Sequence, residues 1–343
     1  MSIVSIVDTL FSAFNAARLR EGANLWSKVM SRPDVTVGVA LSGALIPAGL
    51  GASCLVPLIR RGFIDYVTST GANLYHDIHF ALGRKLFKTH LGVDDRVLLQ
   101  DDLFRIYDIV VENEVLRDTD AFISELLVTP ELSGCRSSAE LHYILGKHLY
   151  EKKKESGIGE ISLLAAAYEM EVPIYAPSPG DSVIGIEAAA VALDGKSFSW
   201  DVNMDVNEMA GLALLSKQNG GKTGVVIFGG GAPKNFILQT QCYLQSMLEI
   251  DDRGHDYFFQ ITDARADTGG LSGATPSEAL TWSKLKSDRL PNAVVCYTDS
   301  TIALPLLTAY LMESKGSREP RRLYKRRDQA LSLLKRMRQR KPP

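Results

Sequence analysis

The residues best suited to covalent chemistry lie between Ala266 and Leu285. Lys284 stands two positions after Trp282, and an amine that packs beside an indole can lose hydration and become a nucleophile. A flexible loop precedes this pair, because three glycines allow backbone angles that other residues avoid: Gly269, Gly270 and Gly273. The alternative is an ordinary solvated lysine on a surface helix, which the spacing of these residues does not exclude.

Signals for the start of a helix follow the loop. Thr275 is a suitable N-cap, Pro276 suits the first helical position, and Glu278 stands where a capping box has an acid. These signals predict a helix from Pro276 that carries Lys284 in its third turn. Glu278 and Lys284 would then be about 120° apart around the helix, so Glu278 is either a ligand for a substrate amine or only a cap.

Short runs of β-branched and aromatic residues predict the strands that must position this segment. They are residues 36–41, 63–68, 172–177, 198–202, 223–228, 257–262 and 293–297. Helical patterns separate them, which predicts an α/β fold with a mainly parallel, Rossmann-like sheet and helices on both faces. A chain of 343 residues with 45% hydrophobic and 23% charged residues suits one such domain, residues 1–316, followed by a basic helix or tail, residues 317–343.

Small residues follow three of these strands. They are Ser42-Gly43 after the first strand, Ser69-Thr70-Gly71 after the second, and Gly229-Gly230-Gly231 after the strand at 223–228. A glycine turn between a strand and a helix lets backbone N–H groups approach a phosphate. An ordinary β–α turn uses the same residue types, so the pattern alone leaves both interpretations open.

Carboxylates occupy the ends of two further strands. Asp181 follows the strand at 172–177, and Asp299 with Ser300 follows the strand at 293–297. Ligands of α/β sheets bind at the carboxyl ends of strands, so Asp181 could bind a ribose hydroxyl or a substrate amine and Asp299 a ribose or adenine. Asp299 could equally be the N-cap of a following helix.

The remaining polar patterns do not favour a metal site or an export signal. His76 and His79 flank Asp77 with no third ligand in view, which is more typical of polar helix residues. The four cysteines include no CxxC pair, which is typical of a reducing cytoplasm. The N-terminus lacks the basic region of a signal peptide, and no apolar run is long enough to span a bilayer.

The net charge of −2 hides an asymmetry. Residues 317–343 contain eleven basic and two acidic residues, whereas the preceding 316 residues contain 27 basic and 38 acidic ones. An acidic body suits a polycationic substrate, although solubility alone explains it as well. The basic segment could bind RNA or a membrane surface, but a packing helix with solvated charges is the more typical structure, so neither partner is favoured.

Two motifs resemble deoxyhypusine synthases. Residues 276–284 match the P-x-E-A-x-x-W-x-K pattern of that family's catalytic-lysine region, and residues 229–234 match its G-G-G-x-x-K segment. The resemblance covers roughly residues 30–312 and implies the family's fold, an NAD cofactor and Lys284 as the covalent residue. Two positions depart from it: Asn235 stands where eukaryotic and archaeal enzymes have a histidine, and Leu271 where the family has an acid that binds the polyamine.

The resemblance also implies a set of binding residues. Those on the cofactor side are Ser42, Gly43, Ser69, Thr70, Gly71, Asp181, Gly229, Gly230, Gly231, Thr268, Gly269, Asp299 and Ser300. Those expected near the polyamine are Glu278, Trp282, Asn235, Glu187 and Asp267. Glu187 stands close to a second acid of the family, and Asp267 could replace the acid that is missing at Leu271.

The reaction implied by the resemblance is NAD-dependent transfer of the aminobutyl group of spermidine through an imine on Lys284. The changes at Asn235 and Leu271 resemble the bacterial branch of the family, for which a small acceptor such as putrescine is implied, giving homospermidine. Modification of a lysine of a translation factor is the alternative, and a non-catalytic NAD-binding relative is another. The resemblance further implies a homotetramer, a dimer of dimers with active sites at the dimer interface.

Overall fold

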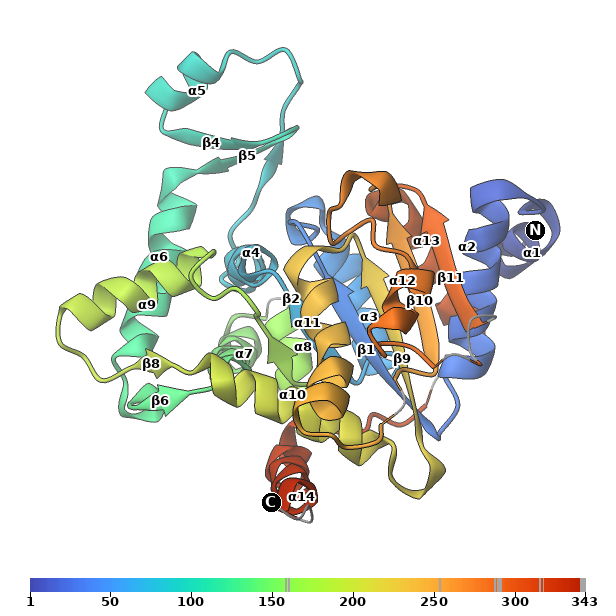
Figure 1. Cartoon of the computed structure of the whole chain (residues 1–343). Helices are drawn as coiled ribbons and strands as arrows, with labels where there is room; N and C mark the ends of the chain where they lie inside the picture. The colour runs from blue at the N-terminus through green and yellow to red at the C-terminus, as the bar shows by residue number, and fades with distance from the viewer. Residues whose placement is uncertain are drawn as a thin grey trace.

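The structure is a computed structural model, and it confirms the α/β fold that the sequence predicts (Figure 1). It describes every residue except 158, 160, 253, 287, 289–291, 315, 317 and 340–343, and for Cys135 and Ser156 it describes the backbone alone. Six parallel strands form the central sheet in the spatial order β11-β10-β9-β1-β2-β7. They are β1 (Val35–Leu41), β2 (Tyr66–Ser69), β7 (Ile174–Tyr175), β9 (Lys222–Phe228), β10 (Tyr257–Thr262) and β11 (Ala293–Tyr297).

Each of these six strands overlaps a strand that the sequence predicts. The seventh predicted strand is β8 (Ser199–Trp200), which pairs with β6 (Cys135–Arg136) in a separate two-stranded sheet. The α-helices are α1 (Ile3–Leu10), α2 (Phe14–Asn24), α3 (Val56–Arg60), α4 (Gly71–Ala81), α5 (Asp95–Gln100), α6 (Asn113–Leu127), α7 (Ser138–Ser156), α8 (Leu163–Met170), α9 (Val183–Leu193), α10 (Val202–Ser216), α11 (Gly231–Cys242), α12 (Pro276–Thr281), α13 (Ser300–Glu313) and α14 (Arg327–Gln339). None of the helices described is long and apolar enough to cross a membrane.

Short 3-10 and π-helical segments also occur among the described residues. They are Leu25–Met30, Ile46–Ala48, Gly51–Leu55, Pro130–Leu132, Gln218–Gly220, Tyr243–Met247, Ala266–Thr268 and Leu323–Arg326. The first of these extends α2 and so lengthens the helical layer that leads into β1.

The central sheet is covered on both faces. In β9, Val225 and Ile227 pack in one hydrophobic cluster, while the alternate residues Val226 and Phe228 pack in another. Helices α10, α11 and α14 contribute to the cluster of Val225, and helices α3, α8 and α13 contribute to the cluster of Val226. The predicted placement of helices on both faces is therefore confirmed, and the continuous apolar runs of the strands follow from it.

One part of the chain stands away from the sheet as an arm (Figure 1). It contains α5 and an antiparallel sheet of β3 (Phe87–Lys88), β5 (Ile109–Glu112) and β4 (Leu103–Ile106). Several large apolar side chains of the arm are exposed, namely Phe87, Leu91, Leu99, Phe104 and Tyr107. Exposed apolar surface of this extent is typical of a contact with another protein chain.

The polar residues of α4 contact neighbouring helices. Asp77 accepts hydrogen bonds from the backbone N–H groups of Leu163 (2.7 Å) and Leu164 (2.9 Å), and so caps the start of α8. His79 Nδ1 lies 2.6 Å from the Thr119 hydroxyl, and burial lowers the pKa of His79 to about 3. These contacts support the interpretation of this group as polar helix residues.

The basic segment near the C-terminus ends in α14, which packs on the body. Ala330, Leu333 and Leu334 are buried in clusters that also contain residues of α10. Ser317 and residues 340–343 of the predicted tail lie outside the described residues. The packing helix that the sequence favours is present, whereas a domain boundary at residue 316 stays a prediction.

Tail arginines pair with buried carboxylates of the body. The Asp65 carboxylate accepts the Val37 N–H at 2.7 Å and forms an ion pair with Arg318. Burial raises the pKa of Asp65, and the Arg318 charge opposes that rise. Arg327 similarly lies 3.3 Å from the buried Glu208. The expectation of solvated charges is therefore wrong for Arg318 and Arg327, which compensate buried acids of the body.

We expect Arg318→Met to lower the free energy of unfolding by about 3 kcal/mol, because the Asp65 carboxylate then loses its main cation in a buried position. Urea denaturation at neutral pH measures the effect. Arg336→Met removes an exposed cation of α14 and should stay within about 0.5 kcal/mol of the wild type. Equal losses in the two variants would contradict the role assigned to Arg318.

Candidate active site

A cavity of about 310 Å³ lies beside Lys284. Its walls come from α11, from β10, from the loop before α12, and from α12 with the residues that follow it. Four residues that the sequence assigns to polyamine chemistry line this cavity: Asn235, Glu278, Trp282 and Lys284. Asn235 and Lys284 are 49 positions apart in the sequence, and the fold brings them together at this cavity.

Lys284 does not lie on the predicted helix. Helix α12 ends at Thr281, and Ser283 has a φ of 56°, in the left-handed region. The chain then turns toward the segment before β10, where the Lys284 carbonyl accepts the His255 N–H at 3.0 Å. This pairing competes with continuation of the helix, so the predicted angular separation from Glu278 is wrong, and both residues line one cavity.

Helix α12 begins as predicted. The Thr275 hydroxyl accepts the Glu278 N–H at 3.3 Å, and Pro276 is the first helical residue. Glu278 therefore occupies a position in the capped first turn and also lines the cavity. Its placement is compatible with both roles that the sequence left open.

The Lys284 amine lies at the cavity wall. Its Nζ donates a hydrogen bond to Asn235 Oδ1 at 3.1 Å and lies 6.0 Å from the centre of the Trp282 ring. Asn235 is a neutral acceptor, so it orients the amine without adding a compensating charge. Trp282 is 66% exposed, which puts the indole at the mouth of the cavity rather than in its interior.

Lys234 is a second amine at this cavity, and the sequence suggested no separate role for it. Only 3% of Lys234 is exposed. Its Nζ donates hydrogen bonds to Gln260 Oε1 at 3.0 Å and to the carbonyls of Ser272 at 3.2 Å and Ala274 at 2.7 Å. Lys234 therefore fixes the loop that leads into α12.

The charge state of Lys234 follows from this environment. Burial lowers the pKa of Lys234 to about 8, while the nearby Glu278 opposes the shift and Lys284 adds to it. The sequence signal that could have predicted this role is the position of Lys234, in the first turn of the helix that follows a buried strand and a glycine turn. Side chains there point back toward the end of the strand.

The expected cofactor loops gather at the carboxyl edge of the sheet. From β1 the chain proceeds to β2 and β7 on one side, and it later returns to β9 on the other side. Such a reversal of strand order is where α/β sheets bind ligands. The loops at this position contain Ser42-Gly43 after β1 and Gly229–Gly231 after β9, and Ser69–Gly71 lies at the end of neighbouring β2.

Serine hydroxyls bind the amides of the glycine turn. The Gly230 N–H donates to Ser42 Oγ at 3.1 Å, and the Gly231 N–H donates to Ser272 Oγ at 2.9 Å. A Cβ on Gly230 would lie 2.3 Å from Ser272 Cα, so glycine is required for this close approach. A Cβ on Gly43 would meet no described atom within 4 Å, so the backbone beside the turn is open.

Thr70, Gly71 and Asp181 form a second group at the same edge. The Thr70 hydroxyl donates to the Gly43 carbonyl at 2.6 Å. Gly71 approaches the residue after Asp181, since a Cβ on Gly71 would lie 2.2 Å from the Ser182 Cβ. The loop of Asp181 is therefore adjacent to the Thr70-Gly71 turn, as a shared ligand site requires.

Two acids expected near the polyamine lie apart from the cavity. Glu187 on α9 accepts a hydrogen bond from the Ser124 hydroxyl on α6. Asp267 is exposed and pairs with Arg265, whose hydrogen bonds lower the pKa of Asp267. Neither residue belongs to the described lining of the cavity, and their contacts with a polyamine stay predictions.

The last cofactor-side residues lie in two places, the start of α13 and the loop before α12. Asp299 is the N-cap of α13, as the alternative interpretation stated, because its Oδ1 accepts the Thr301 N–H at 2.5 Å. Ser300 begins that helix. Thr268 and Gly269 are exposed, and Gly269 has a φ of 72°. Contacts of these residues with a cofactor stay predictions.

The pH dependence of stability should report the buried Lys234. Its pKa is lowered from 10.5 to about 8 in the folded protein, so the unfolded chain binds more protons between these pH values. The free energy of unfolding of the wild type should therefore rise, relative to Lys234→Met, by roughly 1 to 3 kcal/mol between pH 8 and 10.5. Urea denaturation across this range measures the difference, and a constant difference would rule the assignment out.

Comparison with known proteins identifies the family. A family model for deoxyhypusine synthase matches residues 3–311. The deoxyhypusine synthase-like protein of Nostoc punctiforme is 52% identical over 334 residues, which cover 97% of this chain and 86% of that protein. The probable deoxyhypusine synthase 2 of Methanosarcina mazei is 38% identical over 314 residues, 91% of this chain and 87% of that protein.

A solved structure indicates the same fold. It is the crystal structure of a protein from Entamoeba histolytica that is provisionally described as a deoxyhypusine synthase. The two structures align with a TM-score of 0.63 at 13% identity, over 93% of this chain and 96% of the other. Together with the sequence matches, which span nearly the whole chain, this establishes that the protein belongs to the deoxyhypusine synthase family.

Proposed function

We propose that this protein is an NAD-dependent aminobutyltransferase that takes the aminobutyl group of spermidine and carries it on Lys284 as an imine. The main supporting observation is the Lys284 amine at the wall of a cavity of about 310 Å³, 3.1 Å from Asn235. Glu278 contributes a carboxylate to this cavity, and Trp282 contributes an apolar surface. The transfer requires an amine nucleophile, an acid for a substrate ammonium group and a surface for methylene groups.

Lys284 performs the covalent step. The Lys284 amine adds to the imine carbon of the oxidised donor and passes a proton to the donor nitrogen; 1,3-diaminopropane then leaves from that carbon with the bonding electron pair and a second proton. Lys284 then holds the aminobutyl group as an imine until an acceptor amine displaces the Lys284 nitrogen from the imine carbon in the same way. Each exchange forms one carbon–nitrogen bond and breaks another, and the final reduction makes the product stable.

The other cavity residues have binding roles in this proposal. Glu278 binds the primary ammonium group of the aminobutyl chain, and Trp282 covers its methylene groups. Asn235 orients the Lys284 amine through the hydrogen bond at 3.1 Å. Lys234 holds the loop that closes this side of the cavity.

A bound NAD would supply hydride chemistry, namely removal of a hydride from the donor and its return to the final imine. The loops after β1, β2 and β9 fit this cofactor, because the strand order reverses there and the backbone at Gly43 is open. Ser42 and Thr70 supply hydroxyl groups at this position. Asp181, on the adjacent loop, is suited to a ribose hydroxyl.

Putrescine is the acceptor that we favour, with homospermidine as the product. Leu271 gives the cavity an apolar lining where an acid was expected, and the relatives near 50% identity are called deoxyhypusine synthase-like. Transfer to a lysine of a translation factor is the alternative, supported by 38% identity to a probable deoxyhypusine synthase. A non-catalytic NAD-binding protein is the second alternative, and such a protein would tolerate replacement of Lys284.

We also propose that the protein acts in the cytoplasm as a homotetramer, a dimer of dimers with its active sites at the dimer interface. Trp282 and Leu271 are 66% and 51% exposed at the cavity. The arm adds further exposed apolar side chains. Coverage by a second copy would bury this surface and keep water from the imine, which hydrolysis would otherwise destroy.

Product analysis tests the proposed reaction. Purified protein is incubated with NAD, spermidine and putrescine, and the products are identified by mass spectrometry beside a Lys284→Arg variant. We expect homospermidine and 1,3-diaminopropane from the wild type and neither from the variant, because the guanidinium cannot form the imine. Diaminopropane without homospermidine would redirect the search to another acceptor, whereas intact spermidine would refute the donor.

A second variant tests the acid of the cavity. Glu278→Gln should raise the KM for spermidine about tenfold, because a charge-assisted hydrogen bond becomes a neutral one, and should change kcat less. Steady-state kinetics separates the two constants. Asp267→Asn serves for comparison, since a larger rise in KM there would favour the loop acid over Glu278 as the amine ligand.

A further inference from the structure

The backbone of residues 283–286, the Lys284 segment, has an unusual conformation. Ser283 has a φ of 56° although it is not glycine, and such residues persist where their neighbours determine the conformation. The turn puts Lys284 at the cavity while the chain after it runs beside the segment that precedes β10. Whatever holds this turn therefore also aims the nucleophile.

Backbone hydrogen bonds fix the Lys284 segment on both sides. The Lys284 N–H donates to the Ala279 carbonyl at 2.9 Å and closes the end of α12. The His255 N–H donates to the Lys284 carbonyl at 3.0 Å, and the Lys286 N–H donates to the His255 carbonyl at 3.1 Å. The last two bonds form a parallel bridge between His255 and Leu285, which sets the position of Lys284 along the chain.

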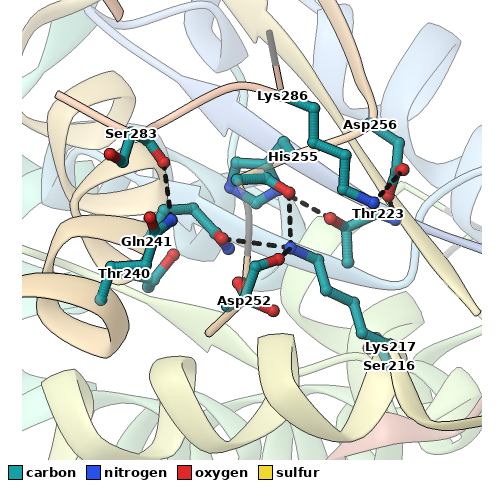
Figure 2. Close-up of polar contacts among 12 residues, drawn as sticks. Ser216, Lys217, Thr223, Thr240, Gln241, Asp252, His255, Asp256, Ser283 and Lys286 are labelled. Atoms are coloured by element: carbon teal, nitrogen blue, oxygen red, sulfur yellow. Dashed lines mark hydrogen bonds and ion pairs between the residues drawn. The ribbon is translucent and has the colours of Figure 1, made fainter. Parts of the chain in front are cut away.

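A side-chain ion pair ties the same segment to the central sheet (Figure 2). Lys286 Nζ lies 2.6 Å from Asp256 Oδ1. Asp256 is 1% exposed, and its Oδ2 accepts the N–H of Thr223, near the start of β9, at 3.0 Å. The buried carboxylate of Asp256, the residue before β10, therefore links β9 to the side chain of Lys286.

The His255 ring acts as a neutral part of this network. Its Nδ1 lies 3.0 Å from the Thr223 hydroxyl, and its Nε2 lies 3.3 Å from the Ile237 carbonyl. A carbonyl can only accept, so Nε2 carries the proton and Nδ1 accepts from Thr223. Burial lowers the pKa of His255 to about 3, so the ring is uncharged at neutral pH and does not compete with Lys286 for Asp256.

A second ion pair involves the segment before β10, which pairs with the Lys284 segment at His255. Lys217 Nζ lies 2.8 Å from Asp252 Oδ2 and 2.9 Å from the Asp252 carbonyl (Figure 2). Gly254, with a φ of 79°, allows the Leu285 backbone to approach closely, since a Cβ there would lie 2.6 Å from the Leu285 carbonyl carbon. The residues before β10 thus form a fixed support against which the Lys284 segment rests.

We propose that Lys286 and Asp256 are positioning residues that aim the Lys284 amine at the cavity. Neither belongs to the lining of the cavity as the structure describes it, so both act through the backbone on either side of Lys284. The inference rests on the proposed function, because it assigns their role to the lysine that carries the aminobutyl group. A displacement of about 1 Å in a reacting group is enough to lower a rate about 100-fold.

The test uses a double variant of the full-length protein, Lys286→Met with Asp256→Asn. It removes the ion pair without leaving a buried charge, and the new amide can still accept the Thr223 N–H. With NAD, spermidine and putrescine, we expect kcat to fall about 100-fold and the KM for spermidine to stay within about threefold. In its crystal structure, the Lys284 amine should no longer lie within hydrogen-bonding distance of Asn235.

Two single variants complete the experiment. Lys286→Arg keeps the charge and should retain kcat within about fivefold of the wild type. Lys222, the first residue of β9, forms a partly exposed ion pair with Asp34, in which Nζ lies 3.6 Å from Oδ2. Lys222→Met removes this pair and should leave kcat unchanged. A double variant with a lower melting temperature but normal kcat and an unmoved Lys284 would overturn the proposal.

The structural readout separates this inference from the proposed function. If the wild type does not turn over spermidine, the aminobutyl transfer is refuted. The crystal structure of the double variant then decides alone: a displaced Lys284 amine supports the positioning role, and an unmoved amine overturns it.

Discussion

The need to neutralise two buried carboxylates ties together the segments around Lys284. Asp256 is paired with Lys286, and Asp252 is paired with Lys217, at the same end of the central sheet. Each pair joins segments that are distant in sequence, and loss of one partner leaves a buried charge that costs several kcal/mol. The Asp256–Lys286 pair therefore ties the Lys284 segment to the residue before β10.

The sequence predicts the sheet well because runs of β-branched residues are local signals. It also predicts Lys284, Glu278 and Asn235 as neighbours, but only through the motifs of a family. The end of α12 was not predictable, because residues 276–284 favour a helix and the competing partner, His255, is distant in the chain. The role of Lys234 was missed for the same reason: its hydrogen-bond acceptors lie on other segments.

The expected cofactor site and the cavity of Lys284 meet at one residue, Ser272. Ser272 accepts the Gly231 N–H with its hydroxyl, and its carbonyl accepts hydrogen bonds from Lys234 and Gln260. The glycine turn belongs to the expected cofactor site, whereas Lys234 lines the cavity of Lys284. Ser272 therefore links the glycine turn to the wall of the cavity that Lys284 also lines.

The pairing of the tail with the body has a consequence for synthesis. Asp65 and Arg318 are 253 positions apart, and a ribosome adds about 5 to 20 residues per second, so Asp65 waits tens of seconds for its partner. Until then the Asp65 carboxylate has the Val37 N–H as a partner but lacks its main cation. A nascent chain that ends before Arg318 therefore carries a carboxylate without its cation directly before β2.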